Sequence, residues 1–148
     1  AKALLAEHAG APNFGFKDPR TLLVLDGWKN LYPSIELIGI YRHPNAVAKS
    51  LEKRSSKSRE ESLKLWYAYN KALFDEYKIN KFSILNFDND EADLDEKMLG
   101  AAAEMGLENK NEEEKFYTAE LRHNDGAGGP SLPWKVSRLY KKLKKFGR

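Results

Sequence analysis

The sequence predicts an α/β fold in which helices flank a parallel sheet to give three layers. Strand-length segments alternate with helical segments along the 148 residues, as in parallel sheets whose strands are joined by crossover helices. The run 35–41, IELIGIY, is almost continuously apolar, which is typical of a strand covered on both faces. Pro19 and Pro44 each follow soon after a predicted strand, where proline suits the first turn of a helix.

Each expected element rests on a local signal. Asp18 can cap a helix that has Pro19 in its first turn, Ser58 with Glu61 matches a capping box, and Gly106 is a natural helix end. Strands are expected at 13–17, 35–41 and 81–87. Helices are expected at 1–9, 18–31, 45–54, 58–77, 88–106 and 134–148.

Two of these helices have a clear apolar face. In the helix over 58–77 it comprises Leu63, Trp66, Tyr67, Asn70, Leu73, Phe74 and Tyr77. In the basic terminal helix, 134–148, it comprises Val136, Leu139, Tyr140 and Leu143. Residues at three-to-four spacing share one side of a helix, so we expect both faces to point into the core.

Composition indicates one globular domain over residues 1–148, 41% hydrophobic and 32% charged. The chain has no cysteine and only three histidines, which excludes disulfides and thiolate chemistry and makes a metal site unexpected. No apolar run approaches the roughly 20 residues that cross a bilayer, and the start lacks the order of a secretory signal. We therefore expect a cytoplasmic protein with no membrane span and no metal cofactor.

The net charge of +3 is small, but its distribution is uneven. The segment 104–120 is acid-rich, whereas 135–148 carries many lysines and no acid. Such a basic tail can attract nucleic acid or an anionic membrane surface. The solvated face of an amphipathic helix explains the same pattern, so we expect no nucleic-acid partner.

Two junctions between a strand and a helix bring a cation and a helix amino terminus together. One contains Lys17, Asp18 and Arg20, and the other contains Arg42 and His43. Ligands of open α/β sheets sit beyond the carboxyl ends of the strands, where helix amino termini attract anions. We therefore expect an anion at this edge, and we expect His43 to be structural because its position suits helix capping.

Four segments carry a resemblance to a known family. In order and spacing they resemble the later two-thirds of a bacterial-type sulfotransferase domain that uses 3′-phosphoadenosine 5′-phosphosulfate (PAPS), with the closest likeness between Phe14 and Phe87 and a weaker one reaching Leu121–His123. The segments are GFKDPRTLLVLDGW, IGIYRHPNAVAKSL, ESLKLWYAYNKAL and FSILNFDN. The resemblance implies a P-loop NTPase-like sulfotransferase fold and transfer of a sulfuryl group to a hydroxyl or amine of a small-molecule or glycan acceptor.

The resemblance also implies roles for individual residues. Arg42 and Ser50 match the arginine and serine that hold the 3′-phosphate of PAPS, and an arginine fork can bind a phosphate bidentately. The resemblance places Lys17, Asp18 and Arg20 at the active cleft. There the two cations would steady the sulfuryl group, and Asp18 would orient one of them or help deprotonate the acceptor. Asp18 is equally well explained as a helix cap.

Two further residues, Arg122 and His123, precede a glycine-rich loop over 124–130. Loops of this kind often close over a bound ligand. We therefore assign both residues to the nucleotide site.

One departure from the family pattern leaves the interpretation open. The family has near its start a loop with lysine and glycine that wraps the 5′-phosphosulfate, and this sequence contains no such loop. We therefore expect a domain that is incomplete at the amino terminus, with the loop upstream. The alternative is a non-catalytic nucleotide- or protein-binding fragment, which could form a homo-oligomer through an exposed sheet edge. A small kinase is disfavoured because kinases need the same missing loop.

Overall fold

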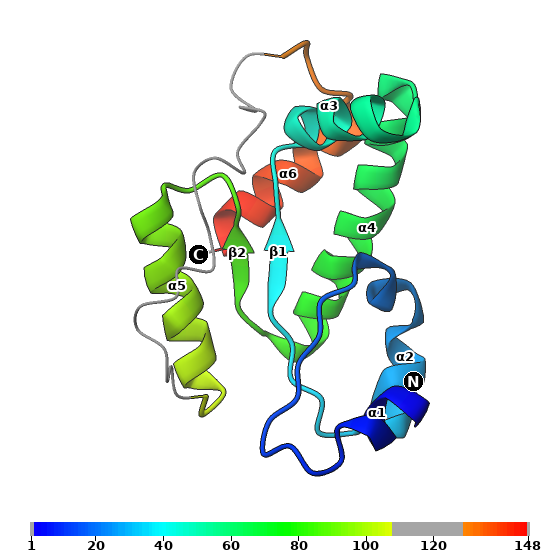
Figure 1. Ribbon diagram of the computed structural model, residues 1–148. Helices are drawn as coiled ribbons and strands as arrows, with labels where there is room; N and C mark the ends of the chain where they lie inside the picture. The colour runs from blue at the N-terminus through cyan, green and yellow to red at the C-terminus, as the bar shows by residue number, and fades with distance from the viewer. Residues whose placement is uncertain (1, 108–128, 148) are drawn as a thin grey trace. The chain divides into compact units, whose positions relative to one another are not determined.

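The computed structural model describes residues 2–107 and 129–147 (Figure 1). The chain divides into two compact units, Ala1–Glu36 and Leu37–Arg148. In the described part of the chain, no helix combines the length and the apolar character that a membrane span requires.

The first unit contains three short helical segments: α1 (Lys2–Glu7), the 3₁₀ helix η1 (Pro19–Val24) and α2 (Leu25–Leu31). Asp18 caps η1 as predicted, because its side chain accepts a hydrogen bond from the Arg20 N–H at 2.8 Å. The helix expected over 18–31 therefore begins as a 3₁₀ turn and becomes α-helical at Leu25.

The strand expected at 13–17 is wrong, since these residues form neither strand nor bridge. Their aromatic side chains instead pack in a row that starts at His8 and ends at Trp28. Ring centroids are 4.2 Å apart for His8 and Phe14, 6.0 Å for Phe14 and Phe16, and 4.7 Å for Phe16 and Trp28. Alternating aromatic residues suit a strand, but here they stack along an irregular segment.

The second unit contains two strands and four helices in the described residues. The strands β1 (Gly39–Tyr41) and β2 (Ile84–Asn86) pair in parallel, with Tyr41 opposite Asn86. The α/β class and the parallel pairing are therefore confirmed. Both strands are shorter than expected, and a two-stranded sheet does not confirm the three-layer sulfotransferase fold. The helices are α3 (Pro44–Ser55), α4 (Arg59–Asn80), α5 (Glu91–Glu104) and α6 (Trp134–Phe146).

Local signals position the helix ends as expected. Pro44 opens α3, and the Ser58–Glu61 capping box at the start of α4 is present in both directions. At the end of α5, Gly106 adopts a φ of +70°, a left-handed conformation that glycine reaches at little cost.

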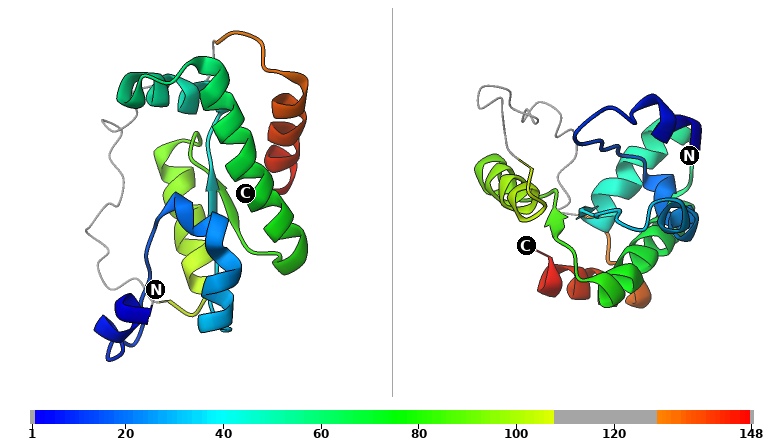
Figure 2. Two further views of the ribbon diagram at one scale, coloured as in Figure 1. Left: turned by 90° about the vertical axis from the view of Figure 1, so that its right-hand side faces the viewer. Right: turned by 90° about the horizontal axis from the view of Figure 1, so that it is seen from below.

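The core of the second unit lies between the sheet and its helices. Within this unit α4 and α6 lie side by side, α3 packs on α4, and α5 lies beside β2 on the side away from α4 (Figures 1 and 2). The predicted inner faces of α4 and α6 are largely buried. Their buried residues are Leu63, Trp66, Leu73, Phe74, Val136, Leu139 and Leu143.

Gly39 lets α4 approach the first residue of β1 closely. A Cβ atom at this position would lie 2.8 Å from the Leu73 Cδ1 and 3.0 Å from the Phe82 ring. Leu73 is buried and Phe82 is half-buried, so an added methyl group would force the helix and strand apart.

Gly39→Ala should therefore destabilise the protein by about 1–3 kcal/mol, the usual cost of overpacking a core. The measurement is the free energy of unfolding from urea titration followed by circular dichroism. Gly100→Ala is the matched control, because Gly100 lies inside α5 with nothing within 4 Å of its added Cβ. In this control the free energy of unfolding should rise by about 1 kcal/mol, because alanine has a higher helix propensity than glycine. Equal changes in the free energy of unfolding for Gly39→Ala and Gly100→Ala would contradict the close approach of α4 to β1 at Gly39.

Candidate functional site

Four residues that follow the two strands meet at one edge of the sheet. Arg42 and His43 follow β1, and Phe87 and Asp88 follow β2. The parallel register brings these strand ends level, and the Phe87 N–H donates to the Tyr41 carbonyl at 2.9 Å. This is the edge at which ligands of open α/β sheets bind.

The centre of the site is an ion pair between Arg42 and Asp88. Arg42 Nε donates to Asp88 Oδ1 at 3.0 Å, and the side chains are 18% and 23% exposed. The guanidinium carbon also lies 5.0 Å from the centre of the Phe87 ring, a cation–π distance. The Asp88 carboxylate and the Phe87 ring therefore fix the position of the Arg42 guanidinium. They hold it more firmly than a fully exposed ion pair would.

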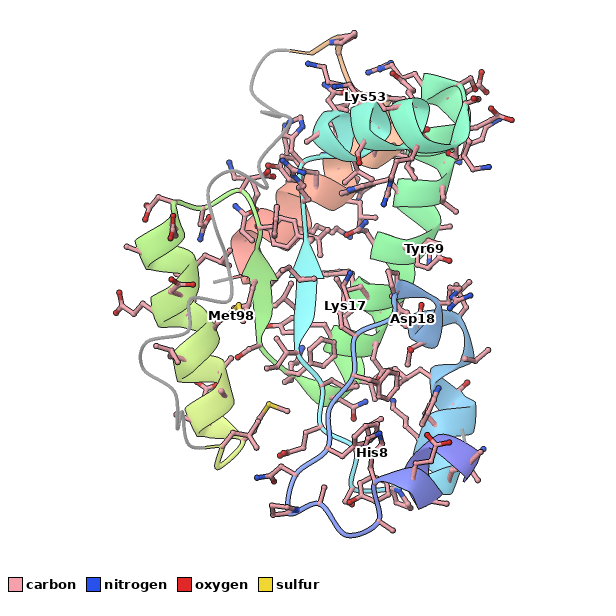
Figure 3. The ribbon with its side chains drawn as sticks, viewed as in Figure 1. His8, Lys17, Asp18, Lys53, Tyr69 and Met98 are labelled. Atoms are coloured by element: carbon pink, nitrogen blue, oxygen red, sulfur yellow. The ribbon has the colours of Figure 1, made fainter. Side chains whose placement is uncertain are left out.

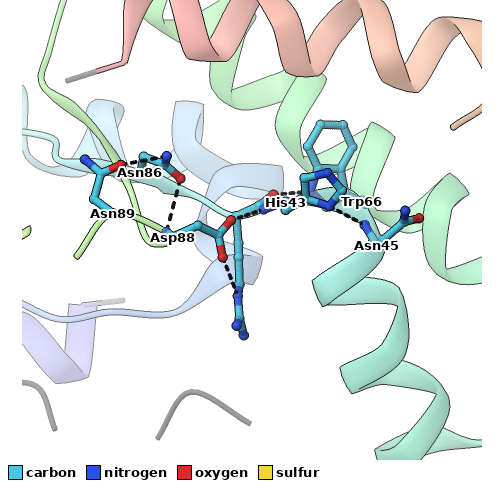
Figure 4. Close-up of polar contacts among 7 residues, drawn as sticks. His43, Asn45, Trp66, Asn86, Asp88 and Asn89 are labelled. Atoms are coloured by element: carbon cyan, nitrogen blue, oxygen red, sulfur yellow. Dashed lines mark hydrogen bonds and ion pairs between the residues drawn. The ribbon is translucent and has the colours of Figure 1, made fainter. Parts of the chain in front are cut away.

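The Asp88 carboxylate also binds the start of α3. Its second oxygen, Oδ2, accepts a hydrogen bond from the His43 N–H at 2.5 Å, while the Asp88 N–H donates to Asn86 Oδ1 at 3.2 Å (Figure 4). One side chain thus holds the ends of both strands and the entry into α3.

His43 caps α3, as its position in the sequence predicted. Its Nδ1 accepts a hydrogen bond from the Asn45 N–H at 3.1 Å, and its ring lies edge-on to Tyr140 with centroids 4.9 Å apart. Burial lowers the pKa of His43 below its usual value, although the nearby Asp88 opposes the shift. From α4, the indole N–H of Trp66 donates to the Arg42 carbonyl at 2.9 Å.

Ser50, the second residue assigned to the 3′-phosphate, is half-buried in α3. It lies roughly 9 Å along the helix axis from Pro44, at about 1.5 Å per residue. Arg42 and Ser50 therefore belong to adjacent elements of one unit. A ligand that reaches both must lie alongside the first half of α3.

Lys17, Asp18 and Arg20 belong to the first unit, just before and within η1 (Figure 3). Arg20 donates through Nε to both Asp18 oxygens at 3.0 Å, and its Nη2 lies 2.5 Å from Oδ2. These bonds from Arg20 lower the pKa of Asp18 to about 2. Such a carboxylate accepts a proton poorly near neutral pH, so orienting Arg20 suits Asp18 better than acting as a base.

The remaining two assigned residues, Arg122 and His123, lie outside the described residues. Among the residues that the structure describes, no group of three or more His, Cys, Asp or Glu side chains could hold a metal ion.

Sequence reasoning missed Asp88, although a signal for it was present. Asp88 follows β2 as Arg42 follows β1, and residues at the carboxyl ends of parallel strands meet at one edge. Residue 88 is instead included in the helix expected over 88–106, whereas α5 begins at Glu91.

A second missed feature is a clamp formed by Arg59 and Asn45. Arg59 Nη2 donates to Asn45 Oδ1 at 3.0 Å and to the Pro130 and Ser131 carbonyls at 3.2 and 3.0 Å. A Cβ on Gly129 would lie only 2.5 Å from Asn45 Nδ2. The clamp fastens the segment that leads into α6 to the first turns of α3 and α4.

Comparison with known proteins found no matching family model, no matching curated protein and no matching solved structure. The function therefore has to be inferred from the chemistry of the site and from the sequence resemblance.

The lowered pKa of His43 predicts a pH dependence of stability. The folded chain binds fewer protons than the unfolded chain between the folded pKa of His43 and its usual value of 6.5. Stability should therefore fall as the pH drops through this window and protonated Nδ1 can no longer accept the Asn45 N–H. His43→Asn keeps a capping side chain but does not titrate. Urea unfolding at neutral and mildly acidic pH should show that the free energy of unfolding falls less in this variant than in the unmodified chain. An equal fall in both proteins would refute the prediction.

Proposed function

We propose that the chain is a sulfotransferase-like domain that transfers a sulfuryl group from PAPS to a hydroxyl or amine acceptor. The observation that carries the proposal is the position of Arg42. It follows a parallel strand directly, precedes the amino terminus of α3, and is held there by Asp88 and Phe87. The motif resemblance assigns this same arginine to the 3′-phosphate.

Asp88 supports an anion-binding role for Arg42 by orienting it. Its bond to Nε fixes the plane of the guanidinium, and a planar donor fork is the group that recognises phosphate bidentately. Arg42 is only 18% exposed and is paired with a carboxylate, so a doubly charged phosphate would have to displace Asp88 from part of the guanidinium or bind beside it against the repulsion of like charge.

The cap on α3 determines where that phosphate would lie. His43 Nδ1 already accepts the Asn45 N–H at the end of the helix. A phosphate would therefore bind along the side of α3, between Arg42 and the hydroxyl of Ser50, instead of on the helix end. Ser50 would add one hydrogen bond from a neutral donor to the bonds from the charged fork of Arg42.

In the proposed reaction an oxygen or nitrogen of the acceptor attacks the sulfur of PAPS. The bond between sulfur and the bridging phosphate oxygen breaks with its electron pair going to that oxygen, adenosine 3′,5′-bisphosphate leaves, and the proton of the acceptor passes to water. The sequence resemblance alone assigns Lys17 and Arg20 to the charge that develops on the sulfuryl and bridging oxygens. Within the first unit, Asp18 orients Arg20.

Selectivity for a 3′-phosphate tests the proposal. The chain should bind adenosine 3′,5′-bisphosphate more tightly than adenosine 5′-monophosphate in calorimetric titrations. Arg42→Lys keeps the charge but loses the fork, so its affinity for the bisphosphate should fall about tenfold or more. Ser50→Ala should reduce the same selectivity by a smaller factor, and neither variant should change binding of the monophosphate.

The matched control is Arg54→Lys, an identical exchange at an exposed arginine in the last turn of α3. It should leave both affinities unchanged. Equal affinity of the unmodified chain for the two nucleotides, or no binding of either, would refute the proposal.

A further inference from the structure

We propose that the outer face of α6 docks the protein on an anionic lipid bilayer. This basic face consists of Trp134, Arg138, Lys141 and Lys145, with Lys142 at its edge above the Phe74 ring of α4. The inference is independent of sulfuryl transfer, because none of these residues belongs to the candidate nucleotide site.

The opposite side of α6 is committed to the core. Val136, Leu139 and Leu143 are buried, and α6 packs on α4 and β2. The cations of the helix must therefore point outward, and all six are exposed. They are Lys135, Arg138, Lys141, Lys142, Lys144 and Lys145, and the helix contains no acid.

The spacing along the basic face forms one continuous stripe. Trp134, Arg138, Lys141 and Lys145 recur at intervals of four, three and four residues, so they share one side of the helix. The stripe is about 16 Å long at about 1.5 Å per residue. Within the described ranges 2–107 and 129–147, no carboxylate forms a salt bridge with any of these cations.

Trp134 is the second observation that points to a membrane surface. Its side chain is 68% exposed at the start of the stripe, whereas Trp66 in the core is 3% exposed. The Arg138 guanidinium lies 5.3 Å from the centre of the Trp134 ring. An exposed tryptophan beside cations suits the headgroup level of a bilayer, where its ring is half apolar and half hydrated.

The shape of this face favours a bilayer over a nucleic acid. Single strands bind in basic grooves where several aromatic rings stack on successive bases. The outer side of one packed helix is convex, and Trp134 is the only aromatic residue of the stripe. A flat layer of anionic headgroups can contact all three cations of the stripe at once, which is how polybasic helices bind such surfaces.

The test is co-sedimentation of the full chain with lipid vesicles. Binding should be strong to phosphatidylcholine mixed with phosphatidylserine, weak to phosphatidylcholine alone, and should decrease with added salt. The triple variant Arg138→Gln, Lys141→Gln and Lys145→Gln should reduce partitioning onto the anionic vesicles roughly a hundredfold, at about fivefold for each charge. Glutamine preserves helix propensity, so the fold should be retained.

The control removes three charges elsewhere and has the same net charge. It combines Lys53→Gln, Arg54→Gln and Lys57→Gln, three exposed residues at the end of α3 and just beyond it (Figure 3). This variant should lose far less binding, because its charges lie off the basic face. The single variant Trp134→Ala should also weaken vesicle binding, but it should leave the salt dependence of binding unchanged.

Three outcomes would overturn the proposal. They are equal losses in the two triple variants, no preference for phosphatidylserine, or vesicle binding that is unchanged while the α6 variant loses affinity for single-stranded RNA. The last result would assign the basic face to nucleic acid.

Discussion

The Asp88 carboxylate joins parts of the chain that lie far apart in sequence, and the second unit depends on it. It accepts hydrogen bonds from the Arg42 side chain and the His43 backbone, 46 and 45 residues away. Two strands of three residues each provide few ladder bonds. The carboxylate therefore completes the pairing where the ladder ends and fixes the direction in which the chain enters α3.

The same connection links stability to the proposed chemistry. An arginine that holds two strand ends and also faces a ligand edge must exchange or share its partner when an anion binds. Trp66 reinforces the position from α4 by donating to the Arg42 carbonyl, so under the proposed function the backbone would stay in place if the guanidinium changed partner. The basic face of α6 is separate from this edge. The helix meets the edge through Tyr140, which packs against His43, whereas the basic face lies opposite the buried residues Val136, Leu139 and Leu143.

Helix positions were largely predictable from sequence, whereas strand extents were not. The Ser58–Glu61 capping box, Pro44 and Gly106 act on their immediate neighbours, and each lies where the structure has a helix end. The aromatic alternation at 13–17 satisfied a strand pattern, yet it forms a stacked row. A strand needs a partner to supply its hydrogen bonds, and no local pattern reveals whether one is there.

The sequence by itself determined the α/β class, the helix caps, the inward face of α6 and the placing of Arg42 at the end of a strand. These features follow from interactions among residues close in the chain. Only the tertiary structure decided that Asp88 pairs with Arg42 and that Arg59 clamps the backbone before α6. Such contacts depend on which distant segments pack together, and charge and hydrogen-bonding capacity alone allow many partners.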